Sequence, residues 1–291
     1  MTRFEHFVAI DWSGAKGAVQ KGIALAVAHG DGGPPVLVDH GWSREDVLSV
    51  LRDELPPYTL IGIDLGIALP FADCDAYFPE WSQSPRDAKE LWRLIDTVCA
   101  GDPHLEATSF VAHPQASRYF RHGKDSTGDR FHHPAAPTRE GRFRKAEDAQ
   151  RSSGVRPVSN FNLVGAAQVG KSSLTGMRML HRLRGHLPVW PIDPLPANGS
   201  VLVEIYTSLA AREAGRGAGK AKMRSFAELN EALAALGSAP VHGDGPIDDH
   251  STDALLTAAW LRKVAHDRRR WDPPGLTGQI AQTEGWTFGA L

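Results

Sequence analysis

Two apolar segments of the sequence end in an aspartate that is followed at once by a turn. Residues 6–11 read HFVAID before Trp-Ser-Gly, and residues 59–64 read TLIGID before Leu-Gly. Runs of β-branched and aromatic residues bounded by turn residues predict β-strands. The second run is apolar almost throughout, which is typical of a strand buried on both faces of its sheet. The pattern therefore favours an α/β fold.

The order of the elements around these two strands predicts a topology. Residues 21–28 and 35–39 are two further strands, and a helix begins after Ser43 and ends near Leu55. Short links make the first three strands an antiparallel meander. The helix is then a right-handed crossover that returns residues 59–64 parallel to a meander strand.

The remainder of the chain has weaker patterns. We predict helices over residues 85–99, 172–183, 226–236 and 251–265, and strands over residues 109–112 and 201–206. Residues 121–159 are rich in Gly, Pro, His and charge, so we expect a long loop with little regular structure there. We expect one domain over residues 1–291, with an insertion or lid over residues 113–190 before the last core strand.

Composition narrows the possible classes of protein. The net charge of -2 excludes a globally cationic nucleic-acid coat. Cys74 and Cys99 are too few for a disulfide framework or a four-thiolate zinc site, which favours a reducing compartment. Asp11 interrupts the first apolar run, and no stretch approaches the roughly 20 apolar residues that span a bilayer. We therefore expect a cytoplasmic protein that does not enter a membrane, of unknown oligomeric state.

Carboxylates at the ends of apolar strands are the main chemical signal. Asp11, Asp64 and Glu204 each end such a strand, and Asp253 lies at the start of the last long predicted helix. A carboxylate in apolar surroundings is costly unless it is hydrogen-bonded, paired or metal-bound. Parallel strands bring their carboxyl ends to one sheet edge, where oxygen donors would suit Mg²⁺ or Mn²⁺. Two such ions roughly 4 Å apart can activate a water and stabilise the leaving oxygen of a phosphodiester.

Each carboxylate also has a simpler interpretation. Asp11 and Asp64 could accept hydrogen bonds from the amides of the turns that follow them. Glu204 could form a salt bridge with its tip in solvent. Asp253 could serve the helix macrodipole, and Asp249 is a candidate N-cap rather than a ligand.

Several segments resemble, in their order along the chain, a family of predicted nucleases with a ribonuclease H-like fold. The resemblance covers most of the length, and the matching segments are VAIDWSGAKG, IGIDLGIALP, SFVAHP, VLVEIY, residues 220–237, DDHSTDALLTAAWL and TEGWTFG. It implies a mixed five-stranded sheet flanked by helices and a metal-dependent nuclease that acts on DNA or RNA. It further implies that Asp11 bridges the metal ions, that Asp64 and Asp253 add ligands, and that Glu204 matches the family's strand glutamate.

The chain departs from this family at three motifs. Only Cys74-Asp75 remains of an Arg-x-Cys-Asp-like segment, and the family's Glu-x-His-Pro-Glu reads Glu204-Ile-Tyr-Thr-Ser here. The carboxylate that commonly stands three residues before the helix aspartate is His250, which could bind Mn²⁺ or carry a proton. The first two changes keep open a non-catalytic scaffold of ribonuclease H-like fold.

A second motif points to another class of function. Residues 165–172 read GAAQVGKS and match the phosphate-loop pattern, so Gly170, Lys171 and Ser172 could bind a nucleotide in an NTPase or switch. A working loop needs a hydrophobic strand just before it, and residues 161–164 make a poor one. The alternative is a helix N-terminus whose glycines allow close packing.

The charge distribution is uneven along the chain. Residues 118–156 hold ten Lys or Arg against five Asp or Glu, with Phe120, Phe131 and Phe143 interleaved. Such a stretch could hold a nucleic-acid backbone, or it could be a solvated loop. The leading hypothesis is a metal-dependent phosphodiester hydrolase that uses Asp11, Asp64, Glu204 and Asp253 as ligands. Whether its substrate is DNA, RNA or a smaller phosphoester stays open.

Overall fold

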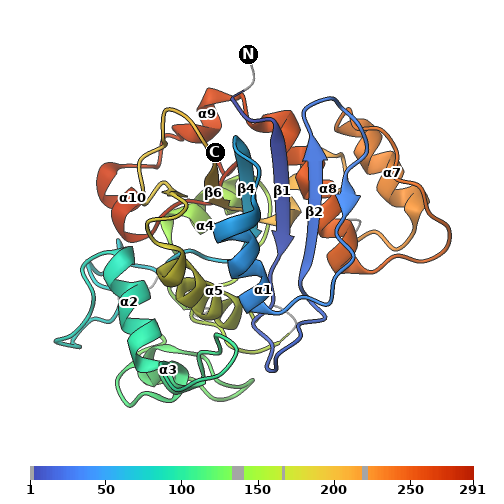
Figure 1. The fold of residues 1–291 in the computed structure, drawn as a ribbon. Coiled ribbons are helices and arrows are strands. Elements are labelled where there is room, and N and C mark those ends of the chain that lie inside the picture. Colours follow the sequence, from blue (N-terminus) through green and yellow to red (C-terminus); the bar gives the residue numbers. More distant parts are fainter. Residues whose placement is uncertain (1–2, 133–140, 166–167, 218–221) are drawn as a thin grey trace.

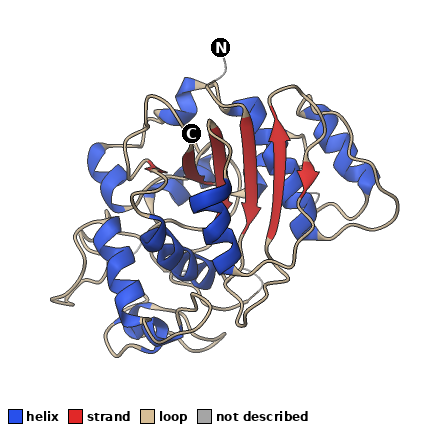
Figure 2. Ribbon diagram, viewed as in Figure 1, coloured by secondary structure: helices blue, strands red, loops and turns tan. Residues whose placement is uncertain are grey.

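A mixed six-stranded sheet with helices on both sides forms the centre of the protein (Figure 2). A computed structural model of the chain describes residues 3–132, 141–165, 168–217 and 222–291. The strand order is β3-β2-β1-β4-β6-β5. The pairs β1·β2 and β2·β3 are antiparallel, whereas β1·β4, β4·β6 and β6·β5 are parallel. The strands are β1 (His6–Asp11), β2 (Ala24–His29), β3 (Val36–Leu37), β4 (Thr59–Asp64), β5 (Val189–Trp190) and β6 (Val201–Glu204).

The strands confirm the predicted meander and the parallel return of β4, and they correct two other predictions. The sheet has six strands instead of five, because the two-residue strand β5 pairs with β6 at the edge. So short a strand, enclosed by Pro188 and Pro191, leaves no periodic pattern in the sequence. The predicted strand over residues 109–112 is wrong: this segment lies in the short helix α3 (Thr108–Ala112).

The predicted helices all form, with small shifts at their ends. Helix α1 (Arg44–Ser49) begins at a capping box, in which the Ser43 side chain accepts from the Asp46 amide and Asp46 accepts from the Ser43 amide. A π-helical segment, η1 (Val50–Glu54), continues it. The other helices are α2 (Ala88–Val98), η2 (Ala116–Tyr119), α4 (Lys145–Ser152), α5 (Val169–Leu183), α6 (Thr207–Glu213), α7 (Phe226–Ala235), α8 (Asp249–Val264), α9 (Arg268–Trp271) and α10 (Gly278–Thr283).

Both faces of the sheet are buried. Alternate strand residues, such as Ile63 and Val203, belong to two separate apolar clusters, one on each face. Helices α1 and α5 lie in front of the sheet in Figure 1, and α8 lies behind it. At Gly62 of β4 a Cβ atom would lie 2.9 Å from Leu261 of α8, so the absence of a side chain lets the helix approach. The double burial explains why β4 has no polar alternation.

The segment before the last core strand is more ordered than its composition predicts. Helix α4 forms within residues 121–159, where we expected little regular structure. The three phenylalanines of the basic stretch are buried in or against the core rather than displayed at a surface: Phe120, Phe131 and Phe143. Among the helices that the structure describes, none is both long and apolar enough to cross a membrane.

Candidate carboxylate site

Asp11 and Asp64 lie side by side at the ends of two parallel strands. The register of β1 and β4 pairs the two residues directly. Successive residues of a strand point to opposite faces, and Ala9 of β1 packs in the cluster on the α8 side. Asp11 therefore leaves the sheet on the α8 side. Asp64 does the same, because it lies two residues after Gly62, which faces α8.

Helix α8 brings two further predicted residues to these aspartates. The His250 Nδ1 and Asp11 Oδ2 atoms are 2.5 Å apart. Asp253 follows on the same helix, close enough for its charge to act on Asp64. The N-cap of α8 is Asp248, whose side chain accepts from the Ser251 amide at 2.9 Å. The prediction of Asp249 as the N-cap is thus wrong by one residue.

Burial and mutual repulsion raise the pKa values of the three aspartates. Burial raises the pKa of Asp64 well above its ordinary value, and the charges of Asp11, Asp253 and Glu204 raise it further. Burial also raises the pKa of Asp253 to about 7, with a smaller contribution from Asp11. For Asp11 burial raises the pKa, and the hydrogen bond with His250 opposes that rise. The same hydrogen bond raises the pKa of His250. These three carboxyl groups therefore disfavour one another's ionisation.

The donor set suits a hard cation in type, but its arrangement is not that of a finished metal site. Asp11, Asp64 and Asp253 supply carboxylate oxygens, the donors that Mg²⁺ and Mn²⁺ prefer. In the described parts of the chain, no three His, Cys, Asp or Glu side chains are grouped so that they could hold a metal ion. Rotation of these side chains is therefore a condition for binding.

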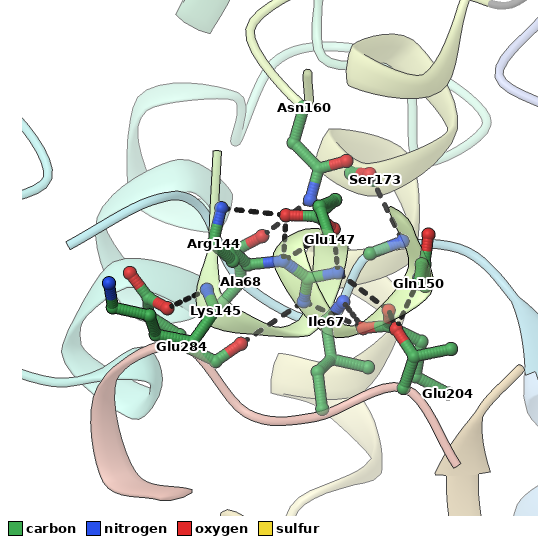
Figure 3. Close-up of polar contacts among 12 residues, drawn as sticks. Ile67, Ala68, Arg144, Lys145, Glu147, Gln150, Asn160, Ser173, Glu204 and Glu284 are labelled. Carbon is green, nitrogen blue, oxygen red and sulfur yellow. Dashed lines mark hydrogen bonds and ion pairs between the residues drawn. The ribbon is translucent and has the colours of Figure 1, made fainter. Parts of the chain in front are cut away.

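Glu204 leaves the opposite face of the sheet, although it lines the same cavity as Asp64. Leu202, two residues earlier in β6, packs in the cluster opposite α8, and Glu204 pairs with Ile63 of that same cluster. Figure 3 shows the Glu204 carboxylate against Arg144. The Arg144 Nη1 and Nη2 atoms donate to its two oxygens at 2.7 and 2.6 Å. Glu204 is therefore the partner of a buried cation.

Arg144 is the centre of a buried network that the sequence did not reveal. Its guanidinium also donates to Glu147, and Nη1 reaches the Glu284 carbonyl at 3.1 Å (Figure 3). Glu204 accepts further hydrogen bonds from the Ile67 amide at 2.9 Å and from Thr287 at 2.5 Å. Burial raises the pKa of Glu147, and Arg144 opposes that rise.

This network joins four segments that are distant in sequence. Arg144 comes from the insertion, Glu204 from β6, Ile67 from the loop after β4, and Glu284 from the C-terminal segment. The Glu284 carboxylate accepts from the Lys145 amide at 2.7 Å. The sequence contained one signal of this network: a carboxylate in an apolar strand, Glu204, requires a counter-ion when it is buried. The sequence does not indicate which arginine supplies that counter-ion.

A cavity of about 210 Å³ lies beside Asp64, between the sheet edge and the insertion. Trp12 and Tyr206 line it from the strand ends, and Gln168 and Ser172 line it from the start of α5. The Trp12 indole donates to Thr175 of α5 at 3.0 Å, so Trp12 is a packing residue here.

The phosphate-loop-like segment does not follow a strand of the sheet. Residues 161–164 contribute only an isolated bridge, between Asn162 and Arg121. Residues 166–167, in the middle of the motif, lie outside the described residues. The strand that a phosphate loop requires is therefore not formed by residues 161–164.

The backbone amides of this segment already have acceptors. The Gly170 amide donates to the Asn162 carbonyl at 2.9 Å, and those of Lys171 and Ser172 donate to Gln168 at 3.0 and 3.3 Å. A Cβ atom on Gly170 would lie 2.6 Å from the Asn160 carbonyl. The glycine therefore permits close packing, and these three amides do not point at a bound phosphate in this arrangement.

The cations of the basic stretch do not share one environment: among the described residues two are buried, and the others are half-buried or exposed. Arg142 and Arg144 are fully buried, and Arg142 pairs with Asp73 at 2.5 Å. Arg118 pairs with Asp129 at 2.6 Å, and Arg130 pairs with Glu80. Arg139 lies outside the described residues. The stretch therefore stabilises the insertion through these ion pairs.

Comparison with known proteins identifies no relative of this chain. The chain matches no protein-family model, no curated protein and no solved structure. The family resemblance of its segments therefore stays a prediction from the sequence, and a function can be inferred only from the residues of the site.

Proposed function

We propose that this protein is a metal-dependent phosphodiester hydrolase of ribonuclease H-like fold that acts on nucleic acid. The observation that carries the proposal is the pairing of Asp11 with Asp64 at the ends of neighbouring parallel strands. Asp253 adds a third carboxyl group to the same cluster, and both Asp253 and Asp64 are half-buried. Buried carboxylates that repel one another destabilise a fold unless a cation compensates them, so this arrangement has a ready explanation in a cation site.

In this proposal the aspartates bind the metal ion and His250 transfers a proton. Asp11, Asp64 and Asp253 would hold Mg²⁺ or Mn²⁺, and Glu204 is excluded from this set because Arg144 holds it on the other face. A bound divalent ion supplies Lewis acidity and lowers the pKa of a coordinated water. His250 is half-exposed beside Asp11 and is placed to accept or return a proton.

Thermal unfolding with Mn²⁺ or Mg²⁺ tests the metal site without assuming activity. Wild type should unfold at a higher temperature when Mn²⁺ is added, because a cation that binds only the folded state stabilises it. Asp11→Asn and Asp64→Asn should lose most of this increase. Asp249→Asn is the matched control, since Asp249 starts the same helix as Asp253 but pairs with Lys222 on the surface. An Mn²⁺ response that survives both active-site substitutions would refute the proposed site.

Hydrolysis of dye-labelled DNA and RNA oligonucleotides then separates an enzyme from a scaffold. An enzyme should cleave at least one of them with Mn²⁺. Asp64→Asn should reduce the rate by at least about tenfold to a hundredfold, because even the loss of a residue that only supports a metal ligand costs that much. A protein that binds Mn²⁺ through Asp11 and Asp64 but cleaves neither polymer would be a non-catalytic scaffold, and the proposed activity would be wrong.

A further inference from the structure

Cationic side chains flank the carboxylate site on two sides. Most of them lie outside residues 118–156, the basic stretch that could hold a nucleic-acid backbone. Lys16 and Lys171 lie towards the end of β1, in the loop after that strand and at the start of α5. Arg156 and Arg212 lie beyond the end of β6. None of these four forms an ion pair with any carboxylate among the described residues.

The first cationic hollow lies between the loop after β1 and helices α3 and α5. Its volume is about 660 Å³. Lys16 and Lys171 supply its positive charge, and Val111 and Leu174 contribute apolar wall. Glu106 also lines it, but its carboxylate accepts from the Gly17 amide at 2.8 Å. Such a wall beside two ammonium groups fits a nucleotide, which joins a phosphate to an aromatic base whose flat face can pack on apolar side chains.

The second cationic hollow lies between helix α6 and residues 154–156. It measures about 240 Å³, and its walls include Arg156, Arg212 and Arg216. Arg216 is engaged by Glu228 at 3.4 Å, whereas Arg212 donates to the Gly154 carbonyl at 3.3 Å. The Arg212 guanidinium therefore keeps donors for an anion, and guanidinium groups suit phosphate oxygens in geometry as well as charge.

These two hollows lie on either side of the smaller cavity beside Asp64. Gln168 lines both the first cationic hollow and that cavity, and Tyr206 lines both that cavity and the second cationic hollow. A line from Lys171 to Arg212 thus passes Asp64, the aspartate that lines this cavity, between two positive regions. A nucleic acid strand, which carries a phosphate at every nucleotide, complements this order of positive, acidic and positive regions. Its scissile phosphate would lie at the carboxylate site and the phosphates on either side would lie at the cations.

We propose that Lys16 and Lys171 on one side, and Arg156 and Arg212 on the other, bind phosphate groups of one nucleic acid strand that crosses the site. The inference rests on the proposed function and assigns its substrate as single-stranded. The cavity beside Asp64 is only about 210 Å³, smaller than the roughly 300–1,000 Å³ of ordinary ligand sites. It admits part of one nucleotide, and a flexible single strand can place one phosphate there while its neighbours reach both hollows, at a lower bending cost than a stiff duplex.

Fluorescence anisotropy with a dye-labelled oligothymidylate tests this path. The probe should be about twelve nucleotides long, within the site sizes of single-strand binders, and the buffer should contain EDTA so that binding is independent of metal. Lys171→Ala and Arg212→Ala should each weaken binding about three- to tenfold. Each should also make the dependence of log affinity on log salt shallower by about 0.7. Lys124→Ala is the control, because Lys124 is exposed and lines none of these hollows.

The double variant decides whether one strand contacts both hollows. Its loss should equal the product of the two single losses, while Lys171→Arg and Arg212→Lys should retain most of the affinity. Wild-type binding by either alanine variant would overturn the path, as would a control that weakens equally or a duplex that binds more tightly than the single strand. If binding behaves as expected but no polymer is cleaved with Mn²⁺, the proposed function fails and the path stands. If cleavage depends on Asp64 but binding ignores Lys171 and Arg212, only the path fails.

Discussion

Asp64 and Glu204 end neighbouring parallel strands, yet their side chains leave opposite faces of the sheet. Asp64 faces helix α8 with the other aspartates, and Glu204 faces Arg144 in the insertion. The same sheet edge therefore carries a cluster of repelling carboxylates on one side and a compensated ion network on the other. The two sides should respond to substitution in opposite directions.

Asp253→Asn should stabilise the metal-free protein at alkaline pH. The pKa of Asp253 is raised from 3.8 to about 7 by burial and by Asp11. A raised pKa favours the protonated carboxyl group in the fold, so its contribution to stability is complete below about pH 3.8 and is lost as the pH rises through about 7. Asparagine removes that loss, and the free energy of unfolding at pH 8 should rise by about 2–4 kcal/mol.

Urea unfolding in EDTA at pH 4 and pH 8 measures this effect. The gain should nearly vanish at pH 4, where the wild-type carboxyl group is largely protonated. Asp249→Asn should change the stability by about 1 kcal/mol or less, because it removes a surface ion pair and a repulsion on Asp253 that is smaller than that of Asp11. A gain of equal size at both pH values would contradict the electrostatic explanation.

Mn²⁺ binding should strengthen as the pH rises towards neutrality. Protons compete with the cation for Asp253, whose pKa is about 7 in the metal-free protein. Below that pH the apparent affinity should fall up to about tenfold per unit. Calorimetric titrations at pH 6, 7 and 8 measure the slope, and Asp253→Asn should bind more weakly with a flatter slope. An unchanged slope in this variant would assign the competing proton to another group.

Arg144→Met should destabilise the protein by about 3–5 kcal/mol, because Glu147 and Glu204 would remain buried without their cation. The triple variant Arg144→Met, Glu147→Gln and Glu204→Gln should recover part of that loss, since it removes the uncompensated charges. Chemical denaturation measures both. Lys145→Met is the neighbouring control, expected within about 0.5 kcal/mol because Lys145 is exposed. A single variant that is no less stable than this control would rule out the network as a major stabilising element.

His250→Asp should strengthen cation binding and weaken the metal-free fold. The substitution replaces the partner of Asp11 with a fourth carboxyl group at the cluster, and affinity for hard cations rises with ligand charge. The increase in unfolding temperature caused by Mn²⁺ should be larger than in wild type, from a lower starting temperature. His250→Gln removes the imidazole without adding charge, so it should share the lower starting temperature but not the larger increase.

The sequence predicted the parts of the site that depend on strand order. Asp11 and Asp64 follow similar apolar runs, and the crossover between those runs makes their strands parallel neighbours. The position of His250 and Asp253 followed from an apolar helix that had to cover the sheet. These inferences needed only connectivity, which short links and a right-handed crossover constrain strongly.

The facing of Glu204 could not be read from the sequence. In a half-buried strand the alternation of polar and apolar residues shows which side chains face the core. Strand β6 is buried on both faces, so its sequence does not indicate which face the Glu204 side chain leaves. The burial of Arg144 could not be predicted for a related reason. Residues 118–156 contain ten Lys or Arg, a composition typical of a solvated loop, whereas Arg144 is buried through its contact with Glu204, 60 residues away. Long-range pairing of this kind leaves no local periodicity.

The contacts of the C-terminal segment with β6 have a consequence for the order of assembly. The Phe288 amide donates to the Glu204 carbonyl at 2.8 Å, Thr287 bonds the Glu204 side chain, and Trp286 is buried. A nascent chain that has emerged only as far as α8 has every aspartate of the cluster but lacks the residues that fasten the end of β6. Glu204, which lines the cavity beside Asp64, therefore acquires these contacts only after residues 286–288 have left the ribosome.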